Sequence, residues 1–268
     1  MDDPPASPGR PIADLARAAL DRRLERNAAA PLVVAFSGGG DSLALLIAAK
    51  AWADAAGRRL LAVTVDHRLQ EAGAAWAAWC QARCQGLGIA HQTAVWEGDK
   101  PATGVAAAAR AARHGLIAQA ARAVGARVVL MGHTADDRLE SNFMRAAGTG
   151  VADPAEWAPS PVWPEGRGVF ILRPLLAARR ADIRRALTAA GETWIDDPAN
   201  LDPRQPRGRA RIVLAGGGEI ERGAPPPRCA FLLAHVIAGP AGDLALPREV
   251  LRAAPAGATR ALIGAALL

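Results

Sequence analysis

Cysteine and lysine are scarce in this chain of 268 residues, and tyrosine is absent. The three cysteines contain no CxxC pair. This argues against a zinc ribbon or a disulfide-stabilised scaffold and favours a reducing cytoplasm. Cys80 and Cys84 are four residues apart, so we expect both to pack in the core from one face of a helix.

Long apolar runs are also missing. The longest, residues 43–49, is far too short to cross a bilayer. Residues 1–5 are acidic and proline-rich, unlike the cationic start of a secretion signal. We therefore expect a cytoplasmic protein with no membrane contact. Residues 1–11 are polar and rich in proline, and we expect them to be disordered.

The charge balance is basic, with a formal net charge of +6 and a pI of about 10.4. Such a balance favours polyanionic partners, above all nucleic acid. However, the only lysines are Lys50 and Lys100, while alanine and arginine dominate. A coding bias towards arginine produces the same balance, so charge alone leaves nucleic-acid binding open.

Short apolar runs alternate with longer amphipathic segments along the first two thirds of the chain. We predict strands at residues 31–36, 60–66, 89–96 and 127–131, and helices at residues 12–26, 42–56, 74–87, 104–124 and 179–190. This alternation predicts an α/β fold with a doubly wound parallel sheet. Ligands of such sheets bind beyond the carboxyl ends of the strands, where the strand order reverses. Residues 151–167 are rich in proline, tryptophan and glycine and predict an irregular loop.

A glycine-rich loop follows the first predicted strand. Glycines let the backbone approach an anion, and the helix that follows directs free N–H groups towards it. A carboxylate beside phosphate is repulsive unless Mg²⁺ bridges the two, so the aspartate of this loop implies a metal. No Gly-Lys-Ser/Thr sequence closes the loop, which excludes a Walker motif. The loop consists of Ser37, Gly38, Gly39, Gly40, Asp41 and Ser42.

Two carboxylates, Asp137 and Glu140, are three residues apart in a segment that we predict to be helical, so they share one face of that helix. Paired carboxylates beyond a strand end suit an ammonium group. The structural alternative is that Thr134 caps a helix whose acidic first turn matches the helix dipole.

Three further basic side chains stand out in the sequence. His133 follows the fourth predicted strand and is a candidate for contact with phosphate or ribose. Arg110 and Arg113 share a face of the helix before that strand. The alternatives are a solvated helix face for the arginines and a purely structural hydrogen bond for the histidine.

Several motifs together carry a family resemblance. SGGGDS matches the SGGxDS signature of the PP-loop ATP pyrophosphatases, which cleave ATP between the α and β phosphates and have an adenine nucleotide alpha-hydrolase-like fold. VDHR (residues 65–68), ARAARH (109–114), GHTADDRLES (132–141), RPLL (173–176) and residues 194–211 follow in order. Over residues 32–211 the chain resembles the tRNA(Ile)-lysidine synthetase family.

The resemblance implies an ATP- and Mg²⁺-dependent ligase. Its partners are free L-lysine and an isoleucine tRNA with the anticodon CAU, whose wobble cytidine is adenylated at C2 and then attacked by lysine. The implied roles are ATP binding for residues 37–42 and His133, the metal ligand for Asp41, phosphate contact for Arg113, and lysine binding for Asp137 and Glu140. Among the basic residues near the end of the match, Arg207 is implied to reach the active site and to contact tRNA with Arg209 and Arg211, in a loop braced by Asp196, Asp197 and Asn200.

The chain departs from the family pattern at its end. Gly208 stands where the family has an asparagine that orders the loop. Residues 12–215 are expected to form the PP-loop catalytic domain, and residues 216–268 a short helical tail that corresponds to an incomplete tRNA-binding domain, as a truncated or frame-disrupted gene would produce. Two alternatives stay open: a thiolase-type tRNA-modifying enzyme, disfavoured because no CxxC is present, and a non-catalytic tRNA- or nucleotide-binding homologue.

Overall fold

The computed structural model describes residues 12–149, 151–215, 235, 237–238, 244–245 and 247–254. These residues belong to two units. The first unit comprises Met1–Leu139 and Asp153–Ala199, and the second comprises Glu140–Ala152 and Asn200–Leu268. Residues 1–11, expected to be disordered, lie outside the described part of the chain, as does most of the expected helical tail at residues 216–268.

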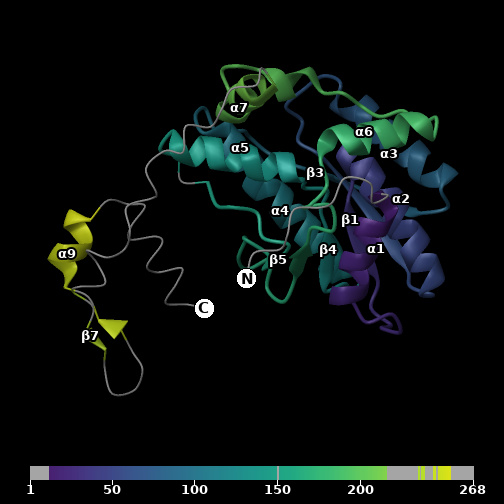
Figure 1. The fold of residues 1–268 in the computed structure, drawn as a ribbon, viewed down its shortest axis with the longest axis horizontal. Coiled ribbons are helices and arrows are strands. Elements are labelled where there is room, and N and C mark those ends of the chain that lie inside the picture. Colours follow the sequence, from purple (N-terminus) through teal and green to yellow (C-terminus); the bar gives the residue numbers. More distant parts are fainter. Residues whose placement is uncertain are drawn as a thin grey trace. The chain divides into compact units, whose positions relative to one another are not determined.

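A six-stranded sheet with the order β3-β2-β1-β4-β6-β5 forms the centre of the first unit (Figure 1). Its strands are β1 (Leu32–Ala35), β2 (Leu60–Asp66), β3 (Ala90–Val95), β4 (Val128–Leu130), β5 (Trp157–Pro159) and β6 (Phe170–Leu172). β5 is antiparallel to β6, and the other strand pairs are parallel. The strand order reverses between β1 and β4, which confirms the predicted doubly wound sheet and marks its switch point.

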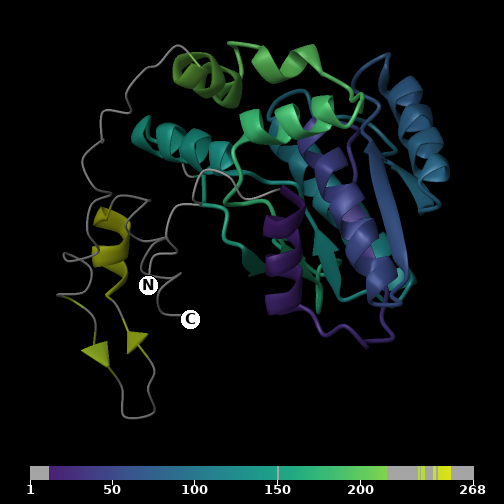
Figure 2. The same cartoon turned by 45° about the vertical axis from the view of Figure 1, so that its right-hand side comes forward.

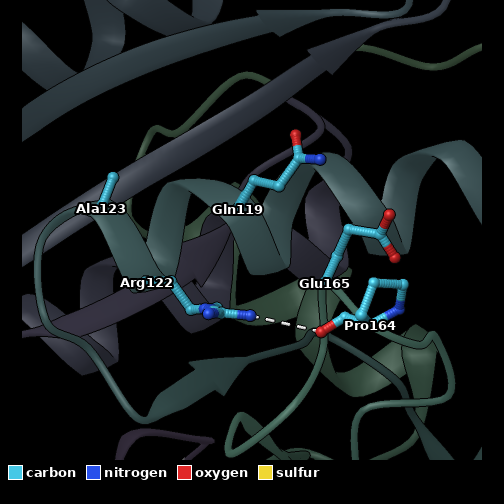
Figure 3. A pocket seen from close by; sticks show the side chains of 5 residues that line it. All are labelled: Gln119, Arg122, Ala123, Pro164 and Glu165. Carbon is cyan, nitrogen blue, oxygen red and sulfur yellow. Dashed lines mark hydrogen bonds between the residues drawn. The ribbon is translucent and has the colours of Figure 1, made fainter.

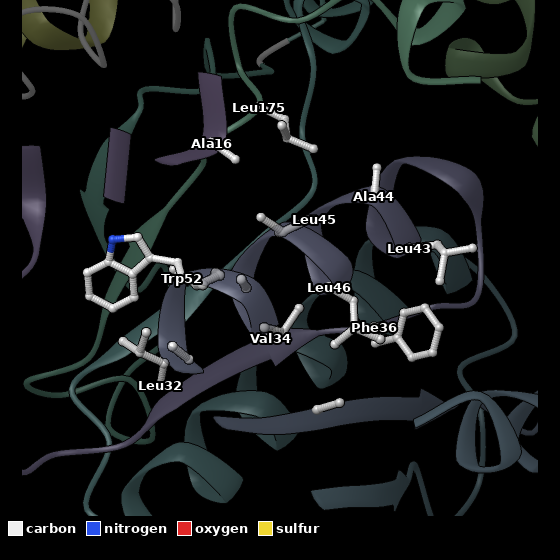
Figure 4. Close-up of a cluster of buried hydrophobic side chains, with 14 of the residues drawn as sticks. Ala16, Leu32, Val34, Phe36, Leu43, Ala44, Leu45, Leu46, Trp52 and Leu175 are labelled. Atoms are coloured by element: carbon white, nitrogen blue, oxygen red, sulfur yellow. The ribbon is translucent and has the colours of Figure 1, made fainter. Parts of the chain in front are cut away.

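Helices cover both faces of this sheet (Figure 2), because alternate strand residues point to opposite sides. On one face, Leu32 and Val34 of β1 pack with side chains of α1 (Ile12–Arg23), α2 (Gly40–Ala55), α3 (Gly73–Gly86) and α6 (Arg180–Ala189). Figure 4 shows this cluster, to which α2 contributes Leu45, Leu46 and Trp52. On the other face, Val33 and Val129 pack against α4 (Val105–Ala123).

The remaining elements follow the sheet or form the second unit. α5 (Ala135–Ala146) starts after β4 in the first unit and continues into the second. The short 3₁₀ helix η1 (Pro198–Leu201) leads into the second unit, where α7 (Pro206–Ala215) follows. The other described elements are the antiparallel pair β7 (Ile237–Ala238) and β8 (Leu244–Ala245), and α9 (Arg248–Ala253).

The structure contains several elements that the sequence did not predict, including the strands β7 and β8 within the expected helical tail. The expected irregular loop at residues 151–167 contains β5, and both β6 and α7 were not predicted. β5 lies within the proline-, tryptophan- and glycine-rich segment and β6 follows it closely, so neither belongs to the alternation of strands and long helices that identified the other strands. β5 also ends on Pro159, a residue that sheets tolerate at an edge strand, and β5 is the edge of this sheet.

A hollow of about 520 Å³ lies at the amino-terminal edge of the sheet, between the last turns of α4 and the loop before β6. It is lined by Gln119, Arg122, Ala123, Pro164 and Glu165, and Arg122 Nη1 donates a hydrogen bond to the carbonyl oxygen of Pro164 at 3.2 Å (Figure 3). The glycine-rich loop follows β1 at the opposite, carboxyl edge. This hollow is therefore remote from the predicted site.

Within the described ranges, no helix has the length and apolar character that crossing a bilayer requires.

Candidate active site at the carboxyl edge of the sheet

The glycine-rich loop connects β1 to α2 and is held in place by its own side chains. Ser42 Oγ donates a hydrogen bond to the carbonyl oxygen of Gly39 at 2.8 Å and lies 3.2 Å from Ser37 Oγ. Gly40 is the first residue of α2. The N–H groups of the first helical turn have no acceptor within the helix, so they point towards an anion at this loop.

Gly38 is glycine for two reasons. Its φ of +83° is rarely accessible to other residues. A Cβ atom at this position would also lie 2.5 Å from Ile195 Cδ1. Ile195 N donates a hydrogen bond to the Gly38 carbonyl oxygen at 3.0 Å, which ties the loop to the segment after α6. The conformation of the loop is therefore fixed by its contact with Ile195 as well as by the hydrogen bonds of its own serines.

Asp41 lies in the first turn of α2 and has one engaged and one orphaned oxygen. Arg180 Nε donates to its Oδ2 at 3.0 Å. Its Oδ1 is buried and has no hydrogen-bond partner among the described residues. Burial raises the pKa of Asp41, and the nearby Arg180 opposes this rise. The orphaned carboxylate oxygen suits a bound cation, and the helix N–H groups suit an anion.

A metal ion at Asp41 would draw few of its ligands from the protein. The described residues include no group of three or more histidine, cysteine, aspartate or glutamate side chains able to hold a metal ion. Mg²⁺ is usually bound through one or two carboxylates, with phosphate oxygens and water completing its octahedron. Asp41 is therefore suited to be the protein ligand of a cation that arrives with a nucleotide.

Asp137 is 6% exposed and is held at the start of α5. Its Oδ2 accepts hydrogen bonds from Thr134 N at 2.8 Å and Thr134 Oγ1 at 3.0 Å. A carboxylate three residues after the cap that accepts the cap's N–H is half of a capping box, so the structural alternative for Asp137 is present. Arg180 Nη2 also lies 3.6 Å from this oxygen, so Asp137 shares its arginine with Asp41.

The loop after β4 meets the glycine-rich loop closely. A Cβ atom on Gly132 would lie 2.9 Å from the carbonyl oxygen of Asp41 and 3.1 Å from Ser42 Cα, so a glycine is needed here. The next residue, His133, accepts a hydrogen bond at Nδ1 from Arg173 Nε at 3.2 Å. The proton of the neutral imidazole is therefore assigned to Nε2.

Basic side chains gather around His114, which is 3% exposed. Its pKa is lowered to about 3, first by burial, then by the guanidinium groups of Arg113 and Arg110, and further by the neighbouring His133 and Arg173. His114 is consequently neutral at physiological pH. The groups that act on it come from α4, which carries Arg113, and from the segments after β4 and β6, which carry His133 and Arg173. This is a favourable environment for phosphate.

Glu140 is the most buried of the predicted carboxylates, with 1% of its surface exposed, and it lies in the second unit. Two arginines of α7 contact it. Arg207 Nε lies 3.2 Å from Oε2, and Arg211 Nε donates to Oε1 at 2.9 Å. Arg209, by contrast, is exposed and donates to the backbone carbonyls of Pro203 and Arg204. Of the three predicted tRNA-binding arginines, two therefore engage Glu140 and one faces solvent.

Gly208 lies between these arginines at a point of close backbone approach. A Cβ atom there would overlap the carbonyl oxygen of Asp202. The asparagine of the family pattern therefore does not fit this conformation, and the start of α7 is shaped by backbone packing instead of a side-chain amide. Of the residues expected to brace this segment, Asn200 contacts it through its carbonyl oxygen, which lies 3.5 Å from Arg211 Nη1 in the second unit. Asp196 instead accepts a hydrogen bond from Arg184 Nη2 of α6 at 2.9 Å in the first unit.

Arg180 and Arg173 are the polar residues of this edge that sequence reasoning missed. Arg173 belongs to the RPLL motif, but the motif gave no indication of its contact with His133. Arg180 is the first residue of α6, and nothing in the sequence around it indicates that it reaches Asp41, 139 positions away.

The two predicted core cysteines, Cys80 and Cys84, are fully buried, and burial raises their pKa to about 11 and about 12 respectively.

Comparison with known proteins adds a family and several relatives. The model of the PP-loop domain matches residues 14–215. A tRNA(Ile)-lysidine synthase of Caulobacter vibrioides is 52% identical over 252 residues, which are 94% of this chain and 60% of that protein. Another, from Rhizobium meliloti, is 44% identical over 202 residues, covering 69% of this chain and 44% of that protein. The chain thus spans 60% or less of the length of these two relatives.

Among solved structures, the fold is similar to that of the U34-tRNA thiolase NcsA from Methanococcus maripaludis with its 4Fe-4S cluster. The TM-score is 0.57 at 12% sequence identity, and the match covers 77% of this chain and 78% of the other. At this identity the likeness concerns the fold alone.

Proposed function

This chain belongs to the PP-loop domain family, and we propose that it is a cytoplasmic ligase that forms lysidine on an isoleucine tRNA with the anticodon CAU. The two relatives named tRNA(Ile)-lysidine synthase support this reaction. The structural observation that carries the proposal is the pairing of a glycine loop at a helix N-terminus with the orphaned oxygen of Asp41. This combination suits a triphosphate that arrives with a divalent cation.

The first step is adenylation of the wobble cytidine. Its C2 oxygen attacks the α phosphorus of ATP, and pyrophosphate leaves. In the proposal, the N–H groups of residues 38–42 and the hydroxyls of Ser37 and Ser42 hold the phosphates, and His133 contacts the nucleotide. Arg113 adds a positive charge on the side of α4. A Mg²⁺ ion at Asp41 supplies charge neutralisation of the leaving group when bound.

The second step is attack of the lysine ε-amine on C2, which releases AMP. We assign the recognition of lysine to the α5 carboxylates, Asp137 and Glu140, because an ammonium group is matched by carboxylate oxygens. Arg180 contacts Asp137 and Arg207 contacts Glu140, so lysine has to compete with guanidinium groups at both positions.

The arginines of α7 are assigned to the RNA. Arg209 is exposed, and its bonds to two backbone carbonyls use only Nη1, so its other N–H groups are available to phosphate. Arg207 and Arg211 bring more N–H donors to Glu140 than one carboxylate can accept. The surplus donors suit the sugar–phosphate backbone of tRNA.

Incorporation of labelled lysine tests the function. Protein, ATP, Mg²⁺ and labelled lysine are incubated with an isoleucine tRNA transcript bearing CAU, and with a control transcript that has uridine at the wobble position. We expect label in the first RNA only, together with AMP. AMP release that requires a sulfur donor would indicate a thiolase-type enzyme, and no ATP turnover with either RNA would indicate a non-catalytic homologue. Both results would overturn the proposal.

A further inference from the structure

Arg180 occupies a position that the proposed reaction does not use. It is the first residue of α6, at the carboxyl edge of the sheet in the first unit. Its backbone N–H donates to Asp136 Oδ2 at 2.6 Å, which fixes the start of the helix. Its side chain is only 20% exposed, so the guanidinium is directed inwards.

The guanidinium joins two carboxylates that come from the first turns of two different helices, α2 and α5. Nε donates to Asp41 Oδ2 at 3.0 Å, and Nη2 lies 3.6 Å from Asp137 Oδ2. The planar fork of arginine can reach both, whereas a lysine ammonium on a flexible stem is a single point charge. Arg180 therefore places a positive charge between Asp41, which we assign to the metal ion, and Asp137, which we assign to lysine.

A divalent cation at Asp41 meets this guanidinium directly. One oxygen of Asp41 is already engaged, and a metal on the other oxygen would lie close to a fixed positive charge that repels it. The phosphates of ATP compensate both charges, so the conflict is relieved when the nucleotide binds. Without ATP, the guanidinium of Arg180 outcompetes a free divalent cation for Asp41, because it is covalently attached to the protein beside that carboxylate.

We propose that Arg180 is a built-in competitor for the metal site, which neutralises Asp41 and Asp137 in the nucleotide-free protein and makes binding of a divalent cation at Asp41 depend on ATP. It acts as a positioning residue through the two aspartates. The inference rests on the metal role of Asp41 in the proposed function, but it requires neither tRNA nor lysine.

Arg184 offers a matched control on the same helix. It contributes favourably to the charge environment of Asp41, yet its side chain is half exposed and contacts Asp196 at 2.9 Å. Replacing Arg184 removes a nearby positive charge without removing a contact to Asp41. Replacing Arg180 removes both.

The test is the affinity of nucleotide-free protein for Mn²⁺, measured by the loss of the electron paramagnetic resonance signal of free Mn²⁺. We expect Arg180→Gln to tighten Mn²⁺ binding by about fivefold or more and Arg184→Gln by less than about twofold. The gain should disappear in the double variant Arg180→Gln/Asp41→Asn. With a non-hydrolysable ATP analogue present, the wild type and Arg180→Gln should differ by less than about twofold.

Arg180 would instead be a purely structural ion pair if Arg180→Gln left Mn²⁺ affinity unchanged or weakened it, or if the gain survived Asp41→Asn. If Arg180→Gln does not fold, Arg180→Lys replaces it in the test, because an ammonium group reaches only one carboxylate at a time. We expect Arg180→Lys to bind Mn²⁺ about twofold more tightly than the wild type. An unchanged Mn²⁺ affinity in this variant would overturn the inference. The Mn²⁺ measurements use no RNA. They can therefore be interpreted even if the lysine-incorporation assay fails.

Discussion

Each unit contains a cluster of arginines and buried carboxylates, but the proportions are opposite. In the first unit, the guanidinium of Arg180 bridges the carboxylates of Asp41 and Asp137. In the second, Arg207 and Arg211 share the carboxylate of Glu140. The first arrangement has two carboxylates for one guanidinium, whereas the second has two guanidinium groups for one carboxylate, which leaves guanidinium donors in excess. The same residue types therefore favour a cation at one cluster and an anion at the other.

Removing the carboxylate of the first cluster should have the largest effect. Asp41→Asn keeps the shape of the side chain but loses the charge that holds the cation, so we expect AMP formation to fall by at least about 100-fold. Binding of tRNA, measured by filter retention, should be unchanged. Full activity of this variant would remove the metal role of Asp41 and with it the contrast between the clusters.

Removing the carboxylate of the second cluster should act on stability. Glu140→Gln leaves two guanidinium groups without their counter-charge; because Arg207 is 34% and Arg211 19% exposed, we expect a loss of about 2 kcal/mol, less than for a fully buried pair. Urea unfolding measures this loss. Glu71→Gln, at an exposed position, is the control and should change stability by less than about 0.5 kcal/mol. Equal stabilities of the two variants would show that the arginines do not depend on Glu140.

Acid should weaken the first unit through His114. Its folded-state pKa of about 3 lies below the ordinary value of 6.5, so the neutral imidazole contributes stability above pH 6.5, and this contribution is lost as the pH falls towards 3. Between pH 7.5 and 5.5 we expect His114 to account for a loss of about 1.4 kcal/mol in the free energy of unfolding. His114→Gln should lose less over that interval, and an unaltered slope in this variant would contradict the assignment.

The smallest expected effect comes from replacing Arg209 of α7, which we compare with Arg211 on the same helix. Arg209 is exposed, so Arg209→Gln should weaken tRNA binding by about threefold and lower the dependence of log affinity on log salt by about one unit, with stability unchanged. Arg211→Gln should lower stability as well, because it breaks the contact with Glu140. Identical effects of the two substitutions on stability would remove the distinction between them.

The sequence predicted the parts of this molecule that local signals encode. β1, β2 and β4 lie in apolar runs of the sequence, and the loop of residues 37–42 follows β1 directly, so its place at the switch point could be anticipated. β5 and β6 could not, because they lie in or just after the proline-, tryptophan- and glycine-rich segment and outside the alternation of strands with long helices. The charge partners of the site were also missed. Arg180 meets Asp41 across 139 positions and Arg211 meets Glu140 across 71, and such pairings follow from the tertiary fold.

The central claim is that residues 37–42 and Asp41 hold the phosphates of ATP together with a cation, and a crystal structure with a non-hydrolysable ATP analogue and Mn²⁺ tests it most directly. We predict phosphate oxygens within hydrogen-bond distance of the N–H groups of residues 38–42, anomalous density for Mn²⁺ beside Asp41, and the guanidinium of Arg180 moved off that carboxylate. A nucleotide bound elsewhere, with this loop empty and Arg180 still on Asp41, would contradict the account.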